Sequence, residues 1–340
     1  MVRMSFVSAM AAWLAVLITL GVAAQAVLHG QSGPLPLGSV FEIPLLTVAA
    51  LLAVAGAAGS LAGGHAVRWS KAGIRLASAA VLFFAVARLG GELWSPVPVA
   101  ADPGSTTLTV LTWNLEMGGR AASLTIQGIT AVDADLVSLQ ELTPDVAAAI
   151  EADPALRDRY PYRILVPDPG TGGMGLLAKR PLTGEGLRGG PLILWAGLHL
   201  DNGRIVQVLG VHPYPPGIRL IGALPLALNT VRRDDDLAAI AAEVAGLPDP
   251  ALALVAGDLN TTPTEPGLDV LMDALTDAHA AVGIGPGPTW RFGPLEDLGL
   301  GLLRIDHVMT GAALTPVAST VDCTLPGDHC RLIVTLQVGP

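Results

Sequence analysis

The sequence predicts an α/β globular region preceded by a bundle of three transmembrane helices. Two observations support this fold class. The first 90 residues hold long apolar runs and only one of the chain's 29 acidic and five of its 19 basic residues. After residue 105, short apolar runs typical of buried strands alternate with segments that favour helices. The 340 residues are therefore expected to form a transmembrane region at 1–91, a linker at 92–105 and a globular domain at 106–340.

Three uncharged runs are the expected membrane spans. Phe6–Leu28 and Ile43–Ala62 match the roughly 20 apolar residues that cross a bilayer, and Ile74–Leu89 is a shorter third span. The basic residues between the second and third spans, and the lack of Lys or Arg at 29–42, place the chain after residue 89 outside the cytoplasm by the positive-inside rule. If the first run is instead a signal peptide, cleaved near residues 22–26, the globular domain stays on the same side.

The globular region is strongly acidic. Residues 91–340 carry 14 basic and 28 acidic side chains, a formal charge of −14. Non-specific binding of DNA or RNA depends on basic surface and counterion release, so this charge disfavours long nucleic acids as the preferred substrate.

The stretch Ala251–Pro263 combines a buried strand with polar residues at its end. Apolar residues 252–256 are followed by Gly257, Asp258 and, two positions later, Asn260. Residues i and i+2 of an extended chain share a face, so the carboxylate and the carboxamide would project together toward a metal, a water or a phosphoryl oxygen. The alternative is an Asx-type turn leading into a helix.

Further polar residues follow other expected strands. Asn114 and Glu116 come after a strand at 107–113, Glu141 after a strand at 135–139, and His212 after a hairpin of 192–200 and 205–211. Each could also be a cap or a surface group at a strand end. Asp306 and His307 are neighbours in a strand at 302–309, so at most one of them enters a shared site. Further strands are expected at 160–166, 175–178 and 332–338, and helices at 124–132, 146–150, 232–244 and 268–278.

Residues 213–228, PYPPGIRLIGALPLAL, are apolar and interrupted by proline. The segment is predicted to be too broken for a good helix or strand. It would either fold over the core or contact lipid, and lipid contact would imply a substrate that comes from the membrane.

The order of these motifs resembles the endonuclease/exonuclease/phosphatase superfamily with the DNase I-like fold. The similarity covers about residues 106–340. The matching motifs, in chain order, are W-N-x-E at 113–116, Q-E at 140–141, the strand-end His212, G-D-L-N at 257–260, I-D-H at 305–307 and G-D-H at 327–329. The family usually has Ser where Gly327 stands, so any role of that hydroxyl is missing here. The resemblance implies a four-layer α/β sandwich of two packed mixed sheets flanked by helices.

The resemblance also implies roles for single residues. It makes Glu141 the principal Mg²⁺ ligand with Asn114, Glu116 and Asp258 beside it, and Mn²⁺ could replace Mg²⁺. Asp258 and Asn260 would hold the attacking water or the phosphate, and Asn114, Asn260 and His212 would contact the substrate. His329 would be the catalytic histidine and general base, oriented by Asp306. Cys323 and Cys330, the only two cysteines, bracket Asp328 and His329 and could close a disulfide in an oxidising space; the alternative is two buried thiols.

Three functions follow from these observations. The first is a membrane-anchored, extracytoplasmic phosphohydrolase acting on a lipid-linked phosphoester or pyrophosphate, such as a polyprenyl phosphate carrier or a phospholipid headgroup. Its architecture resembles the membrane phosphohydrolases associated with teicoplanin resistance. The second is a surface-anchored, Mg²⁺-dependent nuclease, which the acidic charge disfavours. The third is a non-catalytic binding module.

Overall fold

The computed structural model describes residues 2–62, 68–93, 105–188, 192–222, 224–292 and 294–339. The chain divides into two compact units. The helical unit contains Met1–Trp94 and Gly217–Val231, and the sandwich unit contains Ser95–Pro216 and Arg232–Pro340. Most of the expected linker at 92–105 lies outside the described residues.

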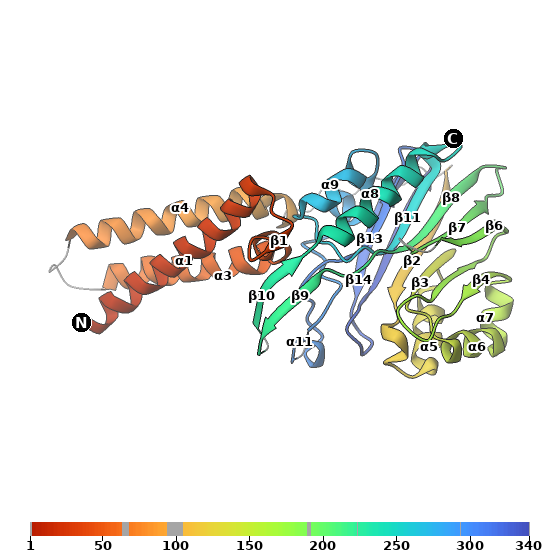
Figure 1. The fold of residues 1–340 in the computed structure, drawn as a ribbon, viewed down its shortest axis with the longest axis horizontal. Helices are drawn as coiled ribbons and strands as arrows, with labels where there is room; N and C mark the ends of the chain where they lie inside the picture. Colours follow the sequence, from red (N-terminus) through yellow and green to blue (C-terminus); the bar gives the residue numbers. More distant parts are fainter. Residues whose placement is uncertain are drawn as a thin grey trace. The chain divides into compact units, whose positions relative to one another are not determined.

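Three long helices, α1 (Val2–Leu28), α3 (Glu42–Ala62) and α4 (Arg68–Leu93), form the helical unit (Figure 1). Within them, residues 7–28, 42–61 and 71–90 are long and apolar enough to cross a membrane. Small side chains such as Ala15, Ala49 and Ala53 are fully buried between the helices. Large apolar ones such as Phe83 face outward, 77% exposed. Small residues inside and large apolar residues outside are typical of helices packed in lipid.

One end of the helical unit carries polar contacts and a small sheet. Arg88 near the end of α4 donates to both carboxylate oxygens of Glu42 at the start of α3, at 2.6 and 2.9 Å. The loop between α1 and α3 contains β1 (Ser32–Gly33) and the short helix α2 (Leu37–Val40). β1 pairs with β10 (Leu224–Asn229), which pairs with β9 (Gly217–Ile221).

The prediction that 213–228 is too broken for a strand is therefore wrong. Most of it forms the β9–β10 hairpin, which belongs to the helical unit. The prolines fit because Pro213, Pro215 and Pro216 precede β9, and Pro225 lies beside a β-bulge. A proline is tolerated at a bulge because no ladder hydrogen bond is lost there.

The sandwich unit contains two six-stranded mixed sheets, with strand orders β14-β15-β2-β3-β5-β4 and β12-β13-β11-β8-β7-β6. β2 runs parallel to β3, and β8 parallel to β11; the other pairs are antiparallel. Apolar side chains of both sheets meet in one core, with Val110 and Leu176 from the first and Val208 and Leu254 from the second. The strands are β2 (Thr106–Asn114), β3 (Leu136–Gln140), β4 (Tyr162–Val166), β5 (Met174–Ala178), β6 (Leu182–Arg188), β7 (Leu192–His199), β8 (Ile205–His212), β11 (Ala253–Asp258), β12 (Thr276–Asp277), β13 (Asp306–Thr310), β14 (Leu314–Asp322) and β15 (Arg331–Val338).

Helices cover the outer faces of both sheets. Val146 and Ile150 of α6 (Pro144–Ala152) pack on the first sheet, and Leu237 and Ile240 of α8 (Val231–Ala245) on the second. The predicted layered α/β sandwich with mixed sheets and flanking helices is confirmed. The remaining helices are α5 (Ala122–Val132), α7 (Pro154–Arg159), α9 (Pro266–Met272), α10 (Ala278–Val282) and α11 (Pro294–Asp297), with 3₁₀ turns at Glu116–Gly118 and Pro250–Leu252.

Some predicted elements have other bounds. The helix expected at 268–278 ends at Met272, and α10 starts separately because the Asp277 side chain accepts the backbone N–H groups of His279 and Ala280. Such an N-cap begins a new helix. The strand expected at 302–309 is β13 at 306–310. The edge strands β6 and β14 were not predicted; β14 alternates buried and exposed positions and holds Pro316 beside a bulge.

Candidate active site

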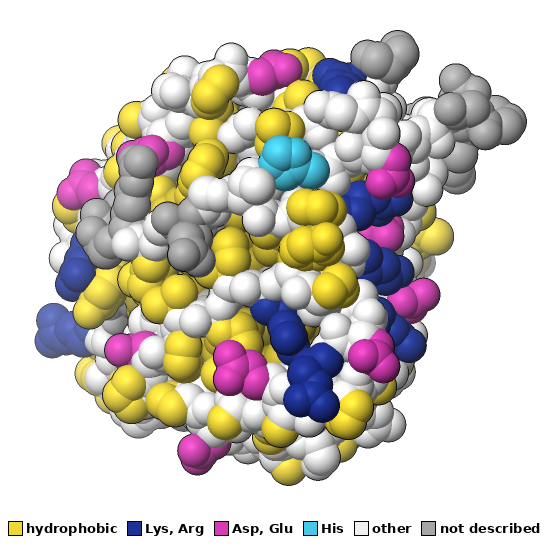
Figure 2. Space-filling model, turned by 90° about the vertical axis from the view of Figure 1, so that its right-hand side faces the viewer, with side chains coloured by type: hydrophobic (Ala, Val, Ile, Leu, Met, Phe, Trp, Pro, Cys, Tyr) yellow, Lys and Arg dark blue, Asp and Glu magenta, His cyan; other side chains and the backbone are white. Residues whose placement is uncertain are grey.

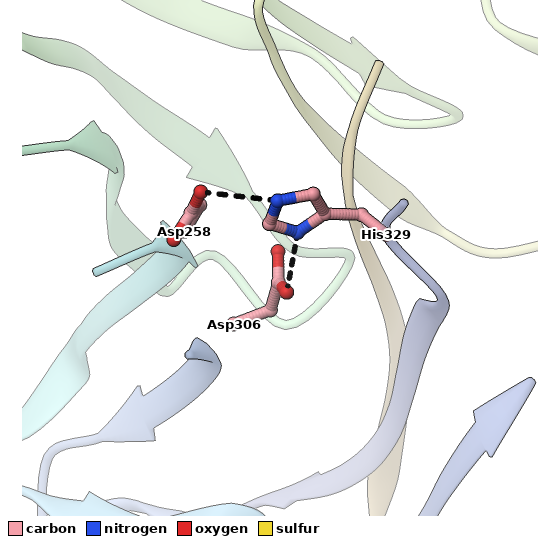
Figure 3. Close-up of side chains that lie close together, drawn as sticks. All are labelled: Asp258, Asp306 and His329. Atoms are coloured by element: carbon pink, nitrogen blue, oxygen red, sulfur yellow. Dashed lines mark hydrogen bonds and ion pairs between the residues drawn. The ribbon is translucent and has the colours of Figure 1, made fainter. Parts of the chain in front are cut away.

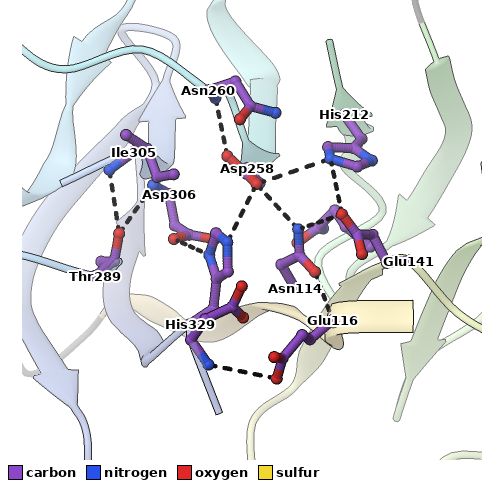
Figure 4. Close-up of polar contacts among 12 residues, drawn as sticks. Asn114, Glu116, Glu141, His212, Asp258, Asn260, Thr289, Ile305, Asp306 and His329 are labelled. Atoms are coloured by element: carbon purple, nitrogen blue, oxygen red, sulfur yellow. Dashed lines mark hydrogen bonds and ion pairs between the residues drawn. The ribbon is translucent and has the colours of Figure 1, made fainter. Parts of the chain in front are cut away.

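The candidate active-site residues lie at strand ends that meet at one edge of the two sheets (Figure 4). β2 and β3 are parallel, as are β8 and β11, so the carboxyl ends of each pair lie side by side. β13 runs antiparallel to β11 with Asp306 opposite Asp258, which brings its first residue to the same edge. The residues placed there are Asn114, Glu141, His212, Asp258 and Asp306, with His329 just before β15.

Asn114 joins the two acidic side chains of the site. Its Nδ2 donates to Glu141 Oε1 at 3.2 Å and to Asp258 Oδ2 at 3.0 Å. Its Oδ1 accepts the backbone N–H of Glu116 at 2.9 Å. The amide nitrogen, not the oxygen, therefore faces the carboxylates. Asn114 could ligate a metal only after its side-chain amide turned over.

Burial disfavours the charged forms of the Glu141 and Asp258 carboxyl groups. Burial raises the pKa of Glu141, although the nearby His212 opposes this shift. Burial also raises the pKa of Asp258 to about 6, against the effect of His329. Glu141 directly follows β3 at φ 54°. A non-glycine residue in this left-handed region is strained, by roughly 1–2 kcal/mol.

His329 and Asp306 form a hydrogen-bonded pair (Figure 3). Nδ1 of His329 lies 2.9 Å from Asp306 Oδ2, and its Nε2 lies 3.6 Å from Asp258 Oδ2. Burial opposes a charge on the imidazole, but the carboxylates of Asp306 and Asp258 outweigh it and raise the pKa of His329 to about 10. Thr289 Oγ1 accepts the backbone N–H groups of Ile305 and Asp306, both at 3.1 Å, and so fixes the start of β13.

His307, the neighbour of Asp306, points to the opposite side of its strand. Its Nδ1 lies 3.0 Å from Asp277 Oδ2 and its Nε2 2.9 Å from the Thr261 carbonyl. The expectation that only one of the pair enters the site is confirmed, and the one that does is Asp306.

His212 joins this cluster of polar side chains from the second sheet. Its Nδ1 lies 3.1 Å from the Thr171 carbonyl oxygen, which can only accept, so Nδ1 carries a proton. Its Nε2 faces the site, 3.7 Å from both Glu141 Oε1 and Asp258 Oδ2. Burial lowers the pKa of His212, although Glu141 opposes this effect.

Asn260 is not placed as the i, i+2 argument predicted. β11 ends at Asp258, and Asn260 has φ 51°, so the two do not share a strand face. The Asn260 backbone N–H donates to Asp258 Oδ1 at 2.8 Å, which is the Asx-type turn of the alternative interpretation. Its side-chain Nδ2 donates to the Pro213 carbonyl at 3.1 Å, beside His212.

Glu116 is not grouped with the other acids. Its Oε2 accepts the backbone N–H of Asp328 at 3.4 Å and lies 3.6 Å from Arg120 Nη2. Figure 4 shows its carboxylate directed away from Glu141 and Asp258. The contacts of Glu116 therefore place it as a support of the loop before His329.

The loop that carries His329 is closed by a disulfide between Cys323 and Cys330.

Residues 111–329 match the endonuclease/exonuclease/phosphatase family in sequence. This segment begins in β2 and ends at His329. The chain belongs to this family. A search of curated proteins found no significant match.

Several solved structures are similar to this chain in fold. D. rerio TDP2, determined with a single-strand DNA product, is 17% identical with a TM-score of 0.52; the match covers 68% of this chain and 99% of that one. The 3′ phosphatase NExo from Neisseria, bound to a product DNA hairpin, is 19% identical with a TM-score of 0.51, covering 67% and 98%. A family protein from Bacteroides vulgatus is 15% identical with a TM-score of 0.52, covering 68% and 99%.

Enzymes of this family typically use a divalent metal, and the donors at this site fit one. Glu141 and Asp258 both approach the same two nitrogens, Asn114 Nδ2 and His212 Nε2, so their carboxylates lie close together. One ligand atom from each of Asp258, Asp306 and His329 also lies within 4.8 Å of the other two, and Asp306 Oδ1 is buried without a hydrogen bond to any described residue. Carboxylate oxygen donors of this kind suit Mg²⁺ or Mn²⁺.

The structure explains why glycine stands at position 327 in place of the family's usual serine. It has φ 118°, and a Cβ there would collide with the Arg120 guanidinium. Arg120 is buried, donates to the Asn114 and Pro326 carbonyls at 3.2 and 3.1 Å, and stacks on Trp113. Arg120 thus connects the W-N-x-E segment to the G-D-H loop in the space a serine side chain would need.

Sequence reasoning missed three supporting groups: Arg120, Thr289 and the Thr171 carbonyl. None of them has a local signal, because each acts through a contact with a distant segment. For Arg120 the only hint is Gly327 itself, since a glycine in place of serine indicates that another group occupies the space.

Proposed function

We propose that this protein is a membrane-anchored, divalent-metal-dependent phosphoester hydrolase that acts outside the cytoplasm on a lipid-linked phosphoester or pyrophosphate. The observation that carries the hydrolase assignment is the convergence of Asn114, Glu141, His212, Asp258 and the Asp306–His329 pair at one sheet edge. These residues come from segments spread over more than two hundred positions. No structural need explains three acids and two histidines gathered at one buried edge.

Each side chain has a role in such a reaction. Glu141 and Asp258 would hold the cation, which supplies a Lewis acid that neutralises charge on the phosphoryl oxygens. Asn114 and His212 would donate to or orient those oxygens. Nε2 of His329 faces the site and would exchange a proton with the attacking water or the leaving oxygen. Asp306 fixes the ring and its tautomer through Nδ1.

Two observations support a lipid-linked substrate. Three helices are long and apolar enough to cross a membrane, and the distribution of basic residues between them supports a location of the sandwich unit outside the cytoplasm. Only four residues, 213–216, separate His212 from the β9–β10 hairpin, which belongs to the helical unit. A substrate anchored in the same membrane would reach such a site by diffusion in the bilayer plane.

A surface nuclease is the second candidate, favoured by two solved relatives that hold DNA products. The formal charge of −14 after residue 90 argues against it. On the face in Figure 2, basic side chains of the described residues are interspersed with acidic ones and form no continuous basic surface.

The two candidates are separated by their substrates. Purified protein in detergent is assayed for phosphate release from a polyprenyl diphosphate and a phospholipid panel, beside nicking of a supercoiled plasmid, with Mg²⁺ or EDTA. We expect Mg²⁺-dependent release from a lipid substrate. Cleavage of the plasmid alone would refute the lipid assignment.

Variants test whether the site is catalytic at all. Glu141→Gln and His329→Ala should abolish turnover, while Glu151→Gln, a matched change on the exposed side of α6, should not. If Glu141→Gln and His329→Ala keep full activity, this site is not the catalytic one. If the wild type turns over no substrate and both variants are indistinguishable from it, a binding module becomes the better assignment. Protease accessibility of the sandwich unit in intact cells tests its location.

A further inference from the structure

The β9–β10 hairpin exposes large apolar side chains that no described residue covers. Ile218, Leu220 and Ile221 on β9 are 56%, 53% and 64% exposed, and Leu226 on β10 is 40% exposed. Arg219 is the only charged residue of the hairpin. Strands at the edge of a soluble sheet usually carry charges or prolines that prevent association, so this composition calls for a partner.

The sheet order places the hairpin against the loop between two apolar helices. β1 begins four residues after the end of α1 and pairs with β10, and β9 is the outer strand of the three. Helix α2, from the same loop, also packs on β10. Within the helical unit of Figure 1, the hairpin extends across the helix axes, not along them.

One face of the hairpin continues from covered to open. Leu228 and Ile218 are directly paired and therefore share a face, and Leu220 lies on it two residues further along β9. Leu228, next to β1, is only 3% exposed, whereas Ile218 and Leu220, on the outer strand, are more than half exposed. This face of the hairpin is therefore covered beside β1 and remains apolar on β9, where it is exposed.

We propose that the hairpin rests in the headgroup–acyl boundary of the lipid bilayer through Ile218, Leu220 and Leu226. The occupant of this face is lipid because the sheet is continuous with the loop between two candidate spans. That loop, residues 29–42, contains no Lys or Arg, and its one acid, Glu42, is buried and paired with Arg88. Apolar side chains at the end of a membrane-spanning bundle are stabilised when they move from water into the headgroup–acyl boundary, because apolar surface is removed from water.

This inference rests on the proposed membrane anchoring. It adds a second membrane contact, which lies in the chain between His212 at the end of β8 and Arg233 in α8. Arg233 Nη1 donates to the Asn260 carbonyl at 2.9 Å, so both segments that flank the hairpin support the candidate active site. Lipid contact at the hairpin would therefore act on the chain on both sides of that site.

The test measures the surroundings of single positions. Leu220→Cys is labelled with an environment-sensitive fluorophore in the full chain, whose own two cysteines are joined in a disulfide and do not react. The protein is reconstituted in phosphatidylethanolamine and phosphatidylglycerol vesicles containing nitroxide-labelled phosphatidylcholine. Leu51→Cys on α3 is the control for lipid, and Ile284→Cys, 83% exposed in the sandwich unit, is the control for water.

We expect the label at 220 to shift to shorter wavelength and to be quenched by nitroxide lipid, as at 51, and to resist aqueous iodide, unlike 284. If 220 behaves like 284 while 51 is quenched by lipid, the hairpin inference is wrong and the anchoring stands. If 51 also behaves like 284, the anchoring and the inference both fail. Should Leu220→Cys not fold, Leu226→Cys on the neighbouring strand gives the same measurement.

Discussion

Opening the disulfide between Cys323 and Cys330 should destabilise the sandwich unit by a calculable amount. The bridge closes a loop of eight residues, because the two cysteines are seven positions apart. The chain-entropy relation for a loop of that size gives about 2.5 kcal/mol at 25 °C. For a unit of this size, each kcal/mol shifts the unfolding temperature by about 2–4 °C, so the expected loss is about 5–10 °C.

Activity well below the unfolding temperature should change much less than stability. The loop keeps other contacts that do not depend on the sulfur atoms. The backbone N–H of Arg291 donates to the Asp328 carbonyl at 2.7 Å, and that of Cys330 to the Thr289 carbonyl at 2.7 Å. Asp306 still holds the ring of His329. The disulfide therefore acts mainly on the unfolded chain.

The assay compares thermal unfolding of oxidised protein, protein reduced with a thiol reagent, and the Cys323→Ser/Cys330→Ser variant. The variant is its own control, because adding reductant to it should change nothing. Mass spectrometry of the untreated protein establishes whether the bridge is present. Equal unfolding temperatures for oxidised and reduced protein, or two free thiols in the untreated protein, would refute the reasoning.

Three further changes have defined outcomes. Mg²⁺ at 100 times its Kd should add about 2.7 kcal/mol to the free energy of unfolding of the wild type and so raise its unfolding temperature. Glu141→Gln should lose this stabilisation, and its kcat should fall about 100-fold or more. An equal Mg²⁺-induced shift in the variant would exclude Glu141 as a ligand. Gly327→Ser should cost about 1–3 kcal/mol through its positive φ and the collision with Arg120, and unchanged denaturant unfolding would contradict this. Burial lowers the pKa of His279 to about 4, so the unfolded state binds more protons than the folded state below pH 6.5. The free energy of unfolding should therefore fall by up to about 3 kcal/mol as the pH drops from 6.5 to 4. His279→Gln should flatten this dependence of stability on pH, and an unchanged dependence would refute the assignment.

Much of the site could be predicted from sequence because its residues end buried strands. A strand covered on both faces is a continuous apolar run, and the first polar residue after it marks the sheet edge. β11, with Asp258 at its end, shows this pattern. β3 is buried throughout, but Ser138 and Gln140 interrupt its apolar run before Glu141. Alternation along a strand also predicted correctly that only one of Asp306 and His307 would enter the site.

The parts that could not be predicted depend on local turns or distant contacts. Asn260 was expected to share a face with Asp258, and Glu116 to lie beside the other acids, but both adopt positive φ, which redirects the side chain. The β9–β10 hairpin pairs with Ser32 and Gly33, almost 200 residues earlier. Nothing in the sequence of Ser32 and Gly33 indicates that these two residues form a strand or which segment they pair with.

Two buried carboxyls, Asp277 on β12 and Asp258 on β11, differ in how completely nearby cationic groups compensate them. Burial opposes ionisation of Asp277, yet Arg304 and His307 outweigh it and hold the pKa of this carboxyl well below its usual range. Asp277 is thus fully compensated by partners within the chain. By contrast, burial keeps the pKa of Asp258 raised, even with His329 nearby. An incompletely compensated carboxyl beside Glu141, in a fold that pairs Asp277 closely, is the arrangement expected if a bound cation supplies further positive charge, as the proposed metal dependence requires.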